Sequence, residues 1–157
     1  MPAMARKTTA ALDDVSKAII EQLQQDGRRS YAAIGKVVGL SEAAVRQRVQ
    51  RLVDSGVMQV VAVTDPLELG FARQAMVGIR VTGQLEPVAD ALADLPEVDY
   101  VVITAGSYDL LAELVCESDD HLLSLISGKI RAIEGVVSTE TFMYLRLRKQ
   151  TYSWGVP

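Results

Sequence analysis

The side chains with the clearest chemical potential lie between residues 43 and 51, in a stretch that carries an apolar repeat. If this stretch is a helix with 100° per residue, Val45, Val49 and Leu52 share one arc. The opposite arc then collects small and polar residues, namely Ala43, Arg46, Gln47, Gln50 and Arg51. Arginine and glutamine can form bidentate hydrogen bonds with guanine and adenine in the major groove. The spacing therefore predicts a helix that packs on one side and reads base edges on the other.

An ordinary solvated helix surface would show the same polar arc, so this alternative stays open on the pattern alone. The context favours DNA binding, because Gly39-Leu40-Ser41 predicts a tight turn in which Ser41 caps the next helix. Nearby basic residues could contact phosphates, namely Arg28, Arg29 and Lys36. Arg48 lies at the edge of the buried arc, where we expect it to meet a phosphate or to pack structurally.

Three short helices are predicted to position this arc: from near Asp13 to Gly27, from Tyr31 to Val38, and from the Ser41 cap to about Asp54. Residues 57–63 are rich in β-branched side chains and predict a strand or ribbon that leads into a connector. The N-terminal half is therefore divided into a mobile arm (1–11), a winged helix-turn-helix (12–56) and a strand with linker (57–71).

The C-terminal half has a different periodicity. It predicts strands at 73–82, 98–105, 109–117 and 136–148, with helices at 85–95 and 119–133. This β-α-β-β-α-β order is that of a ferredoxin-like domain, placed at residues 72–149, so the fold class is α+β. Residues 150–157 form a tail for which the sequence offers no function. Gly128 is an unfavourable residue inside the second helix.

The last predicted strand carries large apolar residues on both faces. Val137, Met143, Leu145 and Leu147 are expected on one side, with Val136, Phe142 and Tyr144 on the other. In a ferredoxin-like domain the helices cover only one face of the sheet, so the second apolar face needs another cover. We expect it to pack against another subunit, although some of these residues could simply be scattered surface apolars.

Charge separates the two halves. The chain has 157 residues and a net charge of −4, but residues 1–65 carry +2 and residues 66–157 carry −6. A mildly basic half can approach DNA phosphates and an acidic half cannot, which favours a bipartite protein. The chain has no apolar run of membrane-spanning length and no secretory signal, so we expect a cytoplasmic protein. The single cysteine, Cys116, is expected to be a core thiol.

Catalytic chemistry is poorly supported. The only histidine, His121, falls in the first turn of a predicted helix, where we expect it to be exposed. The sequence shows no pairing of a nucleophile with a base, no metal-ligand spacing and no phosphate loop. We therefore expect neither an enzyme nor a metal or cofactor site.

Motifs in both halves resemble the Lrp/AsnC family of transcriptional regulators, over about residues 12 to 149. In the N-terminal half they are Leu12-Asp13, Ile19-Ile20, Asp26-Gly27-Arg28, Tyr31-Ala32-Ala33-Ile34-Gly35, Val38-Gly39-Leu40-Ser41, Val45, Arg48-Val49, Leu52 and Ser55-Gly56-Val57. In the C-terminal half they are Leu95-Pro96-Glu97-Val98, Gly106-Ser107-Tyr108-Asp109, Gly135-Val136 and Thr139-Glu140-Thr141. One departure is Ser16, where the family often has a second aspartate.

The resemblance implies an amino-acid effector that binds between subunits, beside the turn Gly106-Ser107-Tyr108-Asp109. Asp109 could accept from the ligand's ammonium group, and the backbone of Gly106, Ser107 and Tyr108 could meet its carboxylate. Thr139 and Thr141 could add hydroxyl groups, while Tyr108 would wall the site. The same turn could instead be only a tight hairpin between two strands.

The leading hypothesis is a sequence-specific regulator whose assembly or DNA binding is modulated by a small effector, an amino acid. The resemblance implies homodimers that assemble into a tetramer or octamer on double-stranded DNA. Dimers would present two recognition helices to half-sites about one helical turn apart, or multiples of it. The alternative is a ligand-independent architectural protein that bends or bridges DNA.

Overall fold

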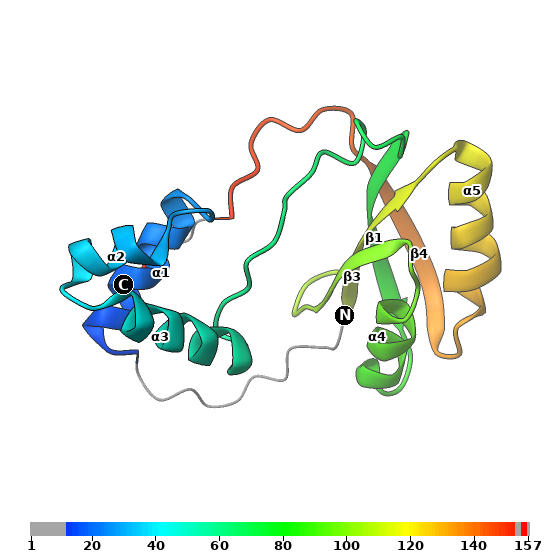
Figure 1. Cartoon of the computed structure of the whole chain (residues 1–157). Coiled ribbons are helices and arrows are strands. Elements are labelled where there is room, and N and C mark those ends of the chain that lie inside the picture. Colours follow the sequence, from blue (N-terminus) through cyan, green and yellow to red (C-terminus); the bar gives the residue numbers. More distant parts are fainter. Residues whose placement is uncertain (1–11, 153–154, 157) are drawn as a thin grey trace. The chain divides into compact units, whose positions relative to one another are not determined.

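The computed structural model describes residues 12–152 and 155–156, and it divides the chain into two compact units (Figure 1). One unit runs to Val63 and also includes the tail from Lys149, and the other spans Thr64–Arg148. The expected mobile arm, residues 1–11, lies outside the described residues. No helix among the described residues is long and apolar enough to cross a membrane.

The three predicted N-terminal helices are confirmed as α1 (Asp14–Gln25), α2 (Tyr31–Val38) and α3 (Glu42–Asp54). Each begins with a side-chain cap, because the side chains of Asp13, Ser30 and Ser41 accept backbone N–H groups of the first helical turns. Their apolar faces share a core made by Ile19, Leu23, Ile34, Val45 and Val49.

The turn between α2 and α3 depends on a close backbone approach at Gly35. The Leu40 N–H donates to the Gly35 carbonyl at 2.9 Å. A β-carbon added at Gly35 would lie 2.4 Å from the Leu40 carbonyl oxygen, closer than real contacts allow. The glycine therefore lets the chain reverse tightly, which sets α3 against α2.

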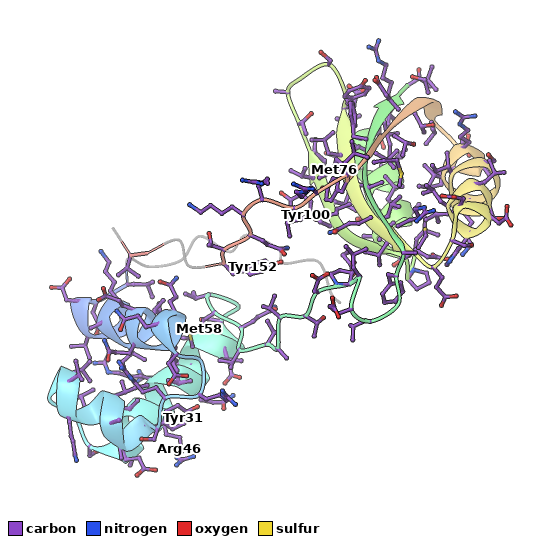
Figure 2. The ribbon with its side chains drawn as sticks, turned by 90° about the horizontal axis from the view of Figure 1, so that it is seen from above. Tyr31, Arg46, Met58, Met76, Tyr100 and Tyr152 are labelled. Atoms are coloured by element: carbon purple, nitrogen blue, oxygen red, sulfur yellow. The ribbon has the colours of Figure 1, made fainter. Side chains whose placement is uncertain are left out.

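The predicted strand at residues 57–63 is wrong for the described chain. Met58–Val63 pair with no strand, so no wing forms, and Val60, Val61 and Val63 are exposed. β-branched residues favour extended backbone, but a ladder also needs a neighbouring strand to accept its hydrogen bonds. The segment instead lines a groove of about 420 Å³ with the end of α1 and with Tyr152 of the tail. Figure 2 labels Met58 and Tyr152.

The second unit has the predicted ferredoxin-like order. Its strands are β1 (Arg73–Val81), β2 (Val98–Ile103), β3 (Leu110–Cys116) and β4 (Val136–Met143), in one sheet with the order β2-β3-β1-β4 and antiparallel pairing. The helices α4 (Leu85–Ala93) and α5 (Asp119–Ser124) lie on one face of the sheet (Figure 1). The core lies between them and the sheet, and it contains Val77, Leu92 and Cys116.

The helix predicted at 119–133 is not a regular α-helix throughout. After α5 the chain continues as a π-helical turn, Leu125–Lys129, and a short 3₁₀ turn, Ile130–Ala132. The wider turn contains Gly128, which has open space around it. Leu125 and Ile130 are both buried in the core, and their separation by five residues matches the wider hydrogen-bond spacing.

At the start of β4, the residues that face each side of the sheet differ from the prediction. A register shift between Arg80 and Val81 pairs Val136 with Val81, so Val136 packs on the core and Val137 is exposed. Simple alternation fails here because a bulge changes which residues face the core. Ladder pairing also ends at Met143, five residues earlier than predicted.

The face of the sheet opposite the helices carries exposed apolar side chains. Phe142 pairs with Met76, and Tyr100 of β2 lies opposite Glu113 of β3. Tyr100 is 52% exposed and Phe142 is 43% exposed. Figure 2 labels Met76 and Tyr100 on this part of the sheet. This open face agrees with the expectation that the second side of the sheet needs a partner.

Candidate DNA interface and effector turn

The amphipathic division of α3 is confirmed. Val45, Val49 and Leu52 are buried, whereas the predicted reading residues are all exposed: Ala43, Arg46, Gln47, Gln50 and Arg51. Ser41 is also exposed and uses its hydroxyl to cap the helix. The outward face therefore carries hydrogen-bonding groups on a helix whose other side is fixed to a core, as a base-reading helix requires.

Two contacts hold Arg46. Its Nη2 donates to Glu42 Oε1 at 2.8 Å, one turn earlier on the helix. Its guanidinium carbon also lies 5.2 Å from the ring centroid of Tyr31, at the start of α2. Neither contact was predicted from the sequence, although Glu42 and Arg46 have the i, i+4 spacing at which helical side chains meet.

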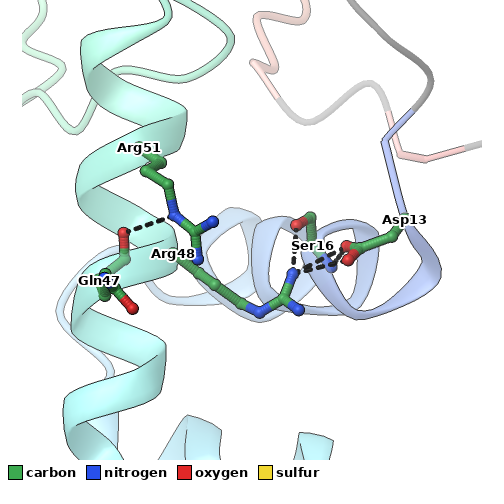
Figure 3. Close-up of polar contacts among 5 residues, drawn as sticks. All are labelled: Asp13, Ser16, Gln47, Arg48 and Arg51. Carbon is green, nitrogen blue, oxygen red and sulfur yellow. Dashed lines mark hydrogen bonds and ion pairs between the residues drawn. The ribbon is translucent and has the colours of Figure 1, made fainter.

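Other polar groups of α3 bond within the helix. Gln50 Nε2 donates to Asp54 Oδ1 at 2.7 Å, and Arg51 Nε donates to the Gln47 carbonyl at 3.4 Å, as Figure 3 shows for Arg51. These bonds are exposed, so water or DNA can replace them. They set the orientation of these side chains in the absence of DNA.

Arg48 packs structurally, which is one of the two expectations for it. Its Nη1 donates to Asp13 Oδ2 at 2.7 Å and to Ser16 Oγ at 3.2 Å (Figure 3). The side chain is only 27% exposed. Hydrogen bonds from Ser16 and then Arg48 hold the pKa of Asp13 well below its usual range. The contact ties α3 to the start of α1, and Ser16 supplies part of it.

The residues predicted to touch phosphates differ in their surroundings. Arg28 is exposed and its backbone N–H donates to Asp26 Oδ1 at 2.9 Å. Arg29 is half-buried and its guanidinium donates to Gln22 Oε1 of α1. Lys36 is exposed on α2. Arg28 and Lys36 are therefore more available to a phosphate than Arg29.

The turn at Gly106–Asp109 joins β2 to β3 and is bonded to β1. The Asp109 N–H donates to the Ile79 carbonyl at 2.9 Å, and Asp109 Oδ2 accepts the Val81 N–H at 2.8 Å. One carboxylate oxygen thus secures the strand at the register shift of β1. Asp109 therefore has the structural role expected if the turn is only a hairpin. Its other carboxylate oxygen, Oδ1, is the one that could meet a ligand.

Tyr108 lies on the open face of the sheet, over Gly78 of β1. A β-carbon at Gly78 would come within 2.7 Å of the ring, so the glycine provides the space for it. The ring makes an edge contact with Phe142, with centroids 6.0 Å apart, and the Arg80 guanidinium lies 5.7 Å from it. A glycine inside a strand is a signal of close approach that could have pointed to this contact.

Thr139 and Thr141 are not brought together with Tyr108. They pair with Ile79 and Val77, whose side chains are in the core, so both threonines face the side of the sheet that the helices cover. Thr139 Oγ1 accepts from Arg131 Nε at 3.0 Å on that side. Of the six residues predicted to bind the effector, Tyr108 and the two threonines therefore lie on opposite faces of the sheet in one chain, and the other three lie in the turn.

His121 is half-buried and not solvent-exposed as predicted. Its Nε2 lies 3.3 Å from Glu97 Oε1, which also accepts from Lys129 Nζ at 2.6 Å. The Lys129 ammonium and the other contacts lower the pKa of Glu97, even though burial opposes this. Cys116 is buried as predicted, and burial raises the pKa of its thiol. Among the described residues, no three His, Cys, Asp or Glu side chains are grouped to hold a metal ion.

A capped helix-turn-helix followed by an α+β domain with an open apolar sheet face is the arrangement expected of a DNA-binding regulator whose C-terminal domain packs against a second copy. Comparison with known families agrees. Residues 12–53 match the AsnC-type helix-turn-helix domain, and residues 71–157 match a C-terminal dimeric α+β barrel domain of AsnC-type regulators. The chain belongs to the Lrp/AsnC family of transcriptional regulators.

Individual relatives extend over nearly the whole chain. The HTH-type transcriptional regulator FL11 of Pyrococcus furiosus is 36% identical over 89% of this chain and 93% of its own. The structure of Escherichia coli AsnC is 26% identical, with a TM-score of 0.75, and covers 91% of this chain and 98% of that one. A Neisseria meningitidis regulator in complex with L-Met has the same fold, with a TM-score of 0.78 at 22% identity and coverage of 94% and 97%.

These matches are to transcriptional regulators and not to enzymes. The protein is therefore a transcriptional regulator with a DNA-binding domain and an effector-binding domain that is dimeric in its family. The matches give no support to the alternative of a ligand-independent architectural protein.

Proposed function

We propose that this protein binds specific DNA sequences through α3 as a homo-oligomer, and that an amino-acid effector modulates its assembly or DNA binding. The observation that carries the proposal is the exposed face of α3, which presents Arg46, Gln47 and Gln50 without a bulky apolar group. In this arrangement α3 enters the major groove, and Arg28 and Lys36 contact phosphates beside it.

The oligomer is proposed from the open face of the C-terminal sheet, where Tyr100 and Phe142 need a cover. A second copy supplies that cover in the dimer, and dimers assemble further into a tetramer or octamer. Light scattering at micromolar protein measures the mass directly. A monomeric mass would contradict this part of the proposal.

The effector site is proposed at Gly106, Ser107, Tyr108 and Asp109, with Thr139 and Thr141. Because the two threonines and Tyr108 lie on opposite faces of the sheet within one chain, packing two open faces together does not join them, and a site that uses both sets requires a contact between dimers. This agrees with binding between subunits. Amino acids are the first candidates, since a regulator of the same fold has been crystallised with L-Met.

The first experiment is a thermal-shift screen of the purified protein against the twenty amino acids, because a ligand that binds the folded state raises Tm. A selective shift that is lost in Asp109→Ala would support the effector role. If calorimetry found that Asp109→Ala binds every amino acid as the wild type does, the role of Asp109 would be wrong.

DNA recognition is tested by mutants of two kinds. We expect Arg46→Ala or Gln47→Ala to change the preferred sequence, whereas Arg28→Ala weakens binding to all sequences and reduces its salt dependence. Equal losses on every sequence for all three variants would contradict this division between base reading and phosphate contact.

A further inference from the structure

Arg46 is held in place before DNA is bound. The bond from its Nη2 to Glu42 Oε1 comes from the same helix, and the ring of Tyr31 comes from α2. Tyr31 is half-buried against the helix-turn-helix core, so its position is fixed by packing. Figure 2 shows the two labelled side chains, Tyr31 and Arg46, next to each other.

We propose that Glu42 and Tyr31 are positioning residues that set the sequence specificity of Arg46. They hold the guanidinium for a guanine edge and hinder it from turning to the phosphate backbone. This inference rests on the proposed function, in which α3 reads base pairs in the major groove.

The stability of α3 depends little on the ion pair between Glu42 and Arg46. Glu42 and Arg46 are 53% and 64% exposed, and exposed pairs of this kind contribute little to stability. At a DNA surface the same pair has a larger effect, because a carboxylate beside the groove repels every nearby phosphate. That repulsion lowers the affinity for every sequence, whereas the orientation that Glu42 gives Arg46 favours a guanine contact on the correct sequence only.

The ring of Tyr31 limits the conformations of Arg46. An unrestrained arginine has many rotamers and can reach several phosphates, which gives affinity without sequence information. A guanidinium that rests on a fixed ring loses less conformational entropy when it binds a base. Both contacts therefore favour the same orientation of the Arg46 guanidinium.

The test begins with selection of a preferred duplex from a random-sequence pool by the wild-type protein. Affinities are then measured for this duplex, its single-base variants and a scrambled duplex, over a range of salt. The variants are Glu42→Gln, Tyr31→Leu and Tyr31→Phe. Glu86→Gln is the matched control, because Glu86 is an exposed acid in the first turn of α4, as Glu42 is in α3.

We expect Glu42→Gln to bind the scrambled duplex more tightly and to reduce the ratio of specific to non-specific affinity by about tenfold. The loss should concentrate at one base position, and Tyr31→Leu should relax the same position. Tyr31→Phe keeps the ring and should retain the ratio, as should Glu86→Gln. In an Arg46→Lys background, Glu42→Gln should change the ratio no further, because its effect acts through the guanidinium.

An unchanged ratio in Glu42→Gln, or one that shifts equally in the Glu86→Gln control, would overturn the inference and leave DNA reading by α3 standing. A wild-type protein that selects no sequence from the pool would overturn the proposed function, and this inference with it. The conservative Glu42→Gln change keeps the shape of the side chain, so its result stands even if Tyr31→Leu does not fold.

Discussion

At the scale of single residues, two glycines allow contacts that no other residue permits. Gly35 lets the Leu40 carbonyl approach within the helix-turn-helix, and Gly78 lets the Tyr108 ring lie on the sheet. The atoms that a new β-carbon would meet differ in how easily they can move. The obstacle at Gly35 is backbone, whereas the obstacle at Gly78 is a side chain that can move. Stability should therefore depend more on Gly35, and the position of Tyr108 in the turn at Gly106–Asp109 more on Gly78.

Gly35→Ala should lower the free energy of unfolding of the N-terminal unit by about 2 kcal/mol or more, because the backbone must shift to admit the β-carbon. Gly128→Ala is the matched control, since its added β-carbon meets nothing within 4 Å, and it should stay within about 1 kcal/mol of the wild type. Denaturant unfolding followed by circular dichroism measures both. A similar loss in the two variants would contradict the steric explanation.

Tyr144 should ionise at unusually high pH. Burial, together with the negative charge and hydrogen bond of Glu113, raises its pKa to about 12. The folded chain therefore keeps the phenol neutral where an unfolded tyrosine ionises near pH 10. Its contribution to stability is complete below pH 10 and is lost as the pH rises toward 12.

The titration of each protein is followed by its phenolate absorbance. Subtracting the curve of Tyr144→Phe from that of the wild type should leave one tyrosine with a midpoint near pH 12. Glu113→Gln should move that midpoint down, because it removes the neighbouring charge. A midpoint near 10 in the wild type would show that Tyr144 is not held beside Glu113.

At the scale of elements, the packing of α3 on α1 depends on a polar contact as well as an apolar core. Arg48 reaches Asp13 and Ser16 at the start of α1. The same Asp13 caps α1 through the Ser16 N–H. One carboxylate thus fixes the beginning of α1 and the attachment of α3 to it, so its charge should influence how firmly α3 is held.

Asp13→Asn should lower Tm at neutral pH, because asparagine can still cap the helix but cannot pair with Arg48. The pKa of Asp13 is lowered from 3.8 in the folded chain, so its contribution is present at neutral pH and is lost as the pH falls below about 4. The variant should therefore lose less stability on acidification than the wild type does. Asp14→Asn, one residue later, is the control, and an identical acid dependence in all three proteins would contradict the assignment.

At the scale of the whole molecule, the chain returns from the C-terminal unit to the N-terminal one after Arg148. The tail from Lys149 groups with the DNA-binding unit, and Thr151 and Tyr152 line the groove formed by Met58–Val63 and the end of α1. The linker and the tail are thus two covalent connections between the domains.

Deletion of the tail from Lys149 onward should lower the Tm of the N-terminal unit by about 5 °C, because the groove beside Met58 becomes exposed. The transition of the C-terminal unit should stay in place, since β4 ends at Met143. Calorimetry resolves the two transitions if they separate, and Tyr152→Ala should reproduce part of the effect. No shift in either variant would show that the tail does not stabilise this unit.

The sequence by itself predicted the three N-terminal helices, the Ser41 cap, the amphipathic face of α3 and the order of strands and helices in the second domain. These features depend on residues close together in the chain, where period, capping and turn composition act directly. The resemblance in its motifs also identified the family correctly. Most of the candidate DNA-reading face could therefore be named in advance.

Only the tertiary structure decided features that join distant residues. These are the pairing of Arg48 with Asp13, the contact of Arg46 with Tyr31, the unpaired state of residues 57–63, and the placement of Thr139 and Tyr108 on opposite faces. Each depends on register, on a bulge or on which segment lies beside another, and a local pattern contains none of these. The sequence thus specifies the elements, and their packing specifies which side chains meet.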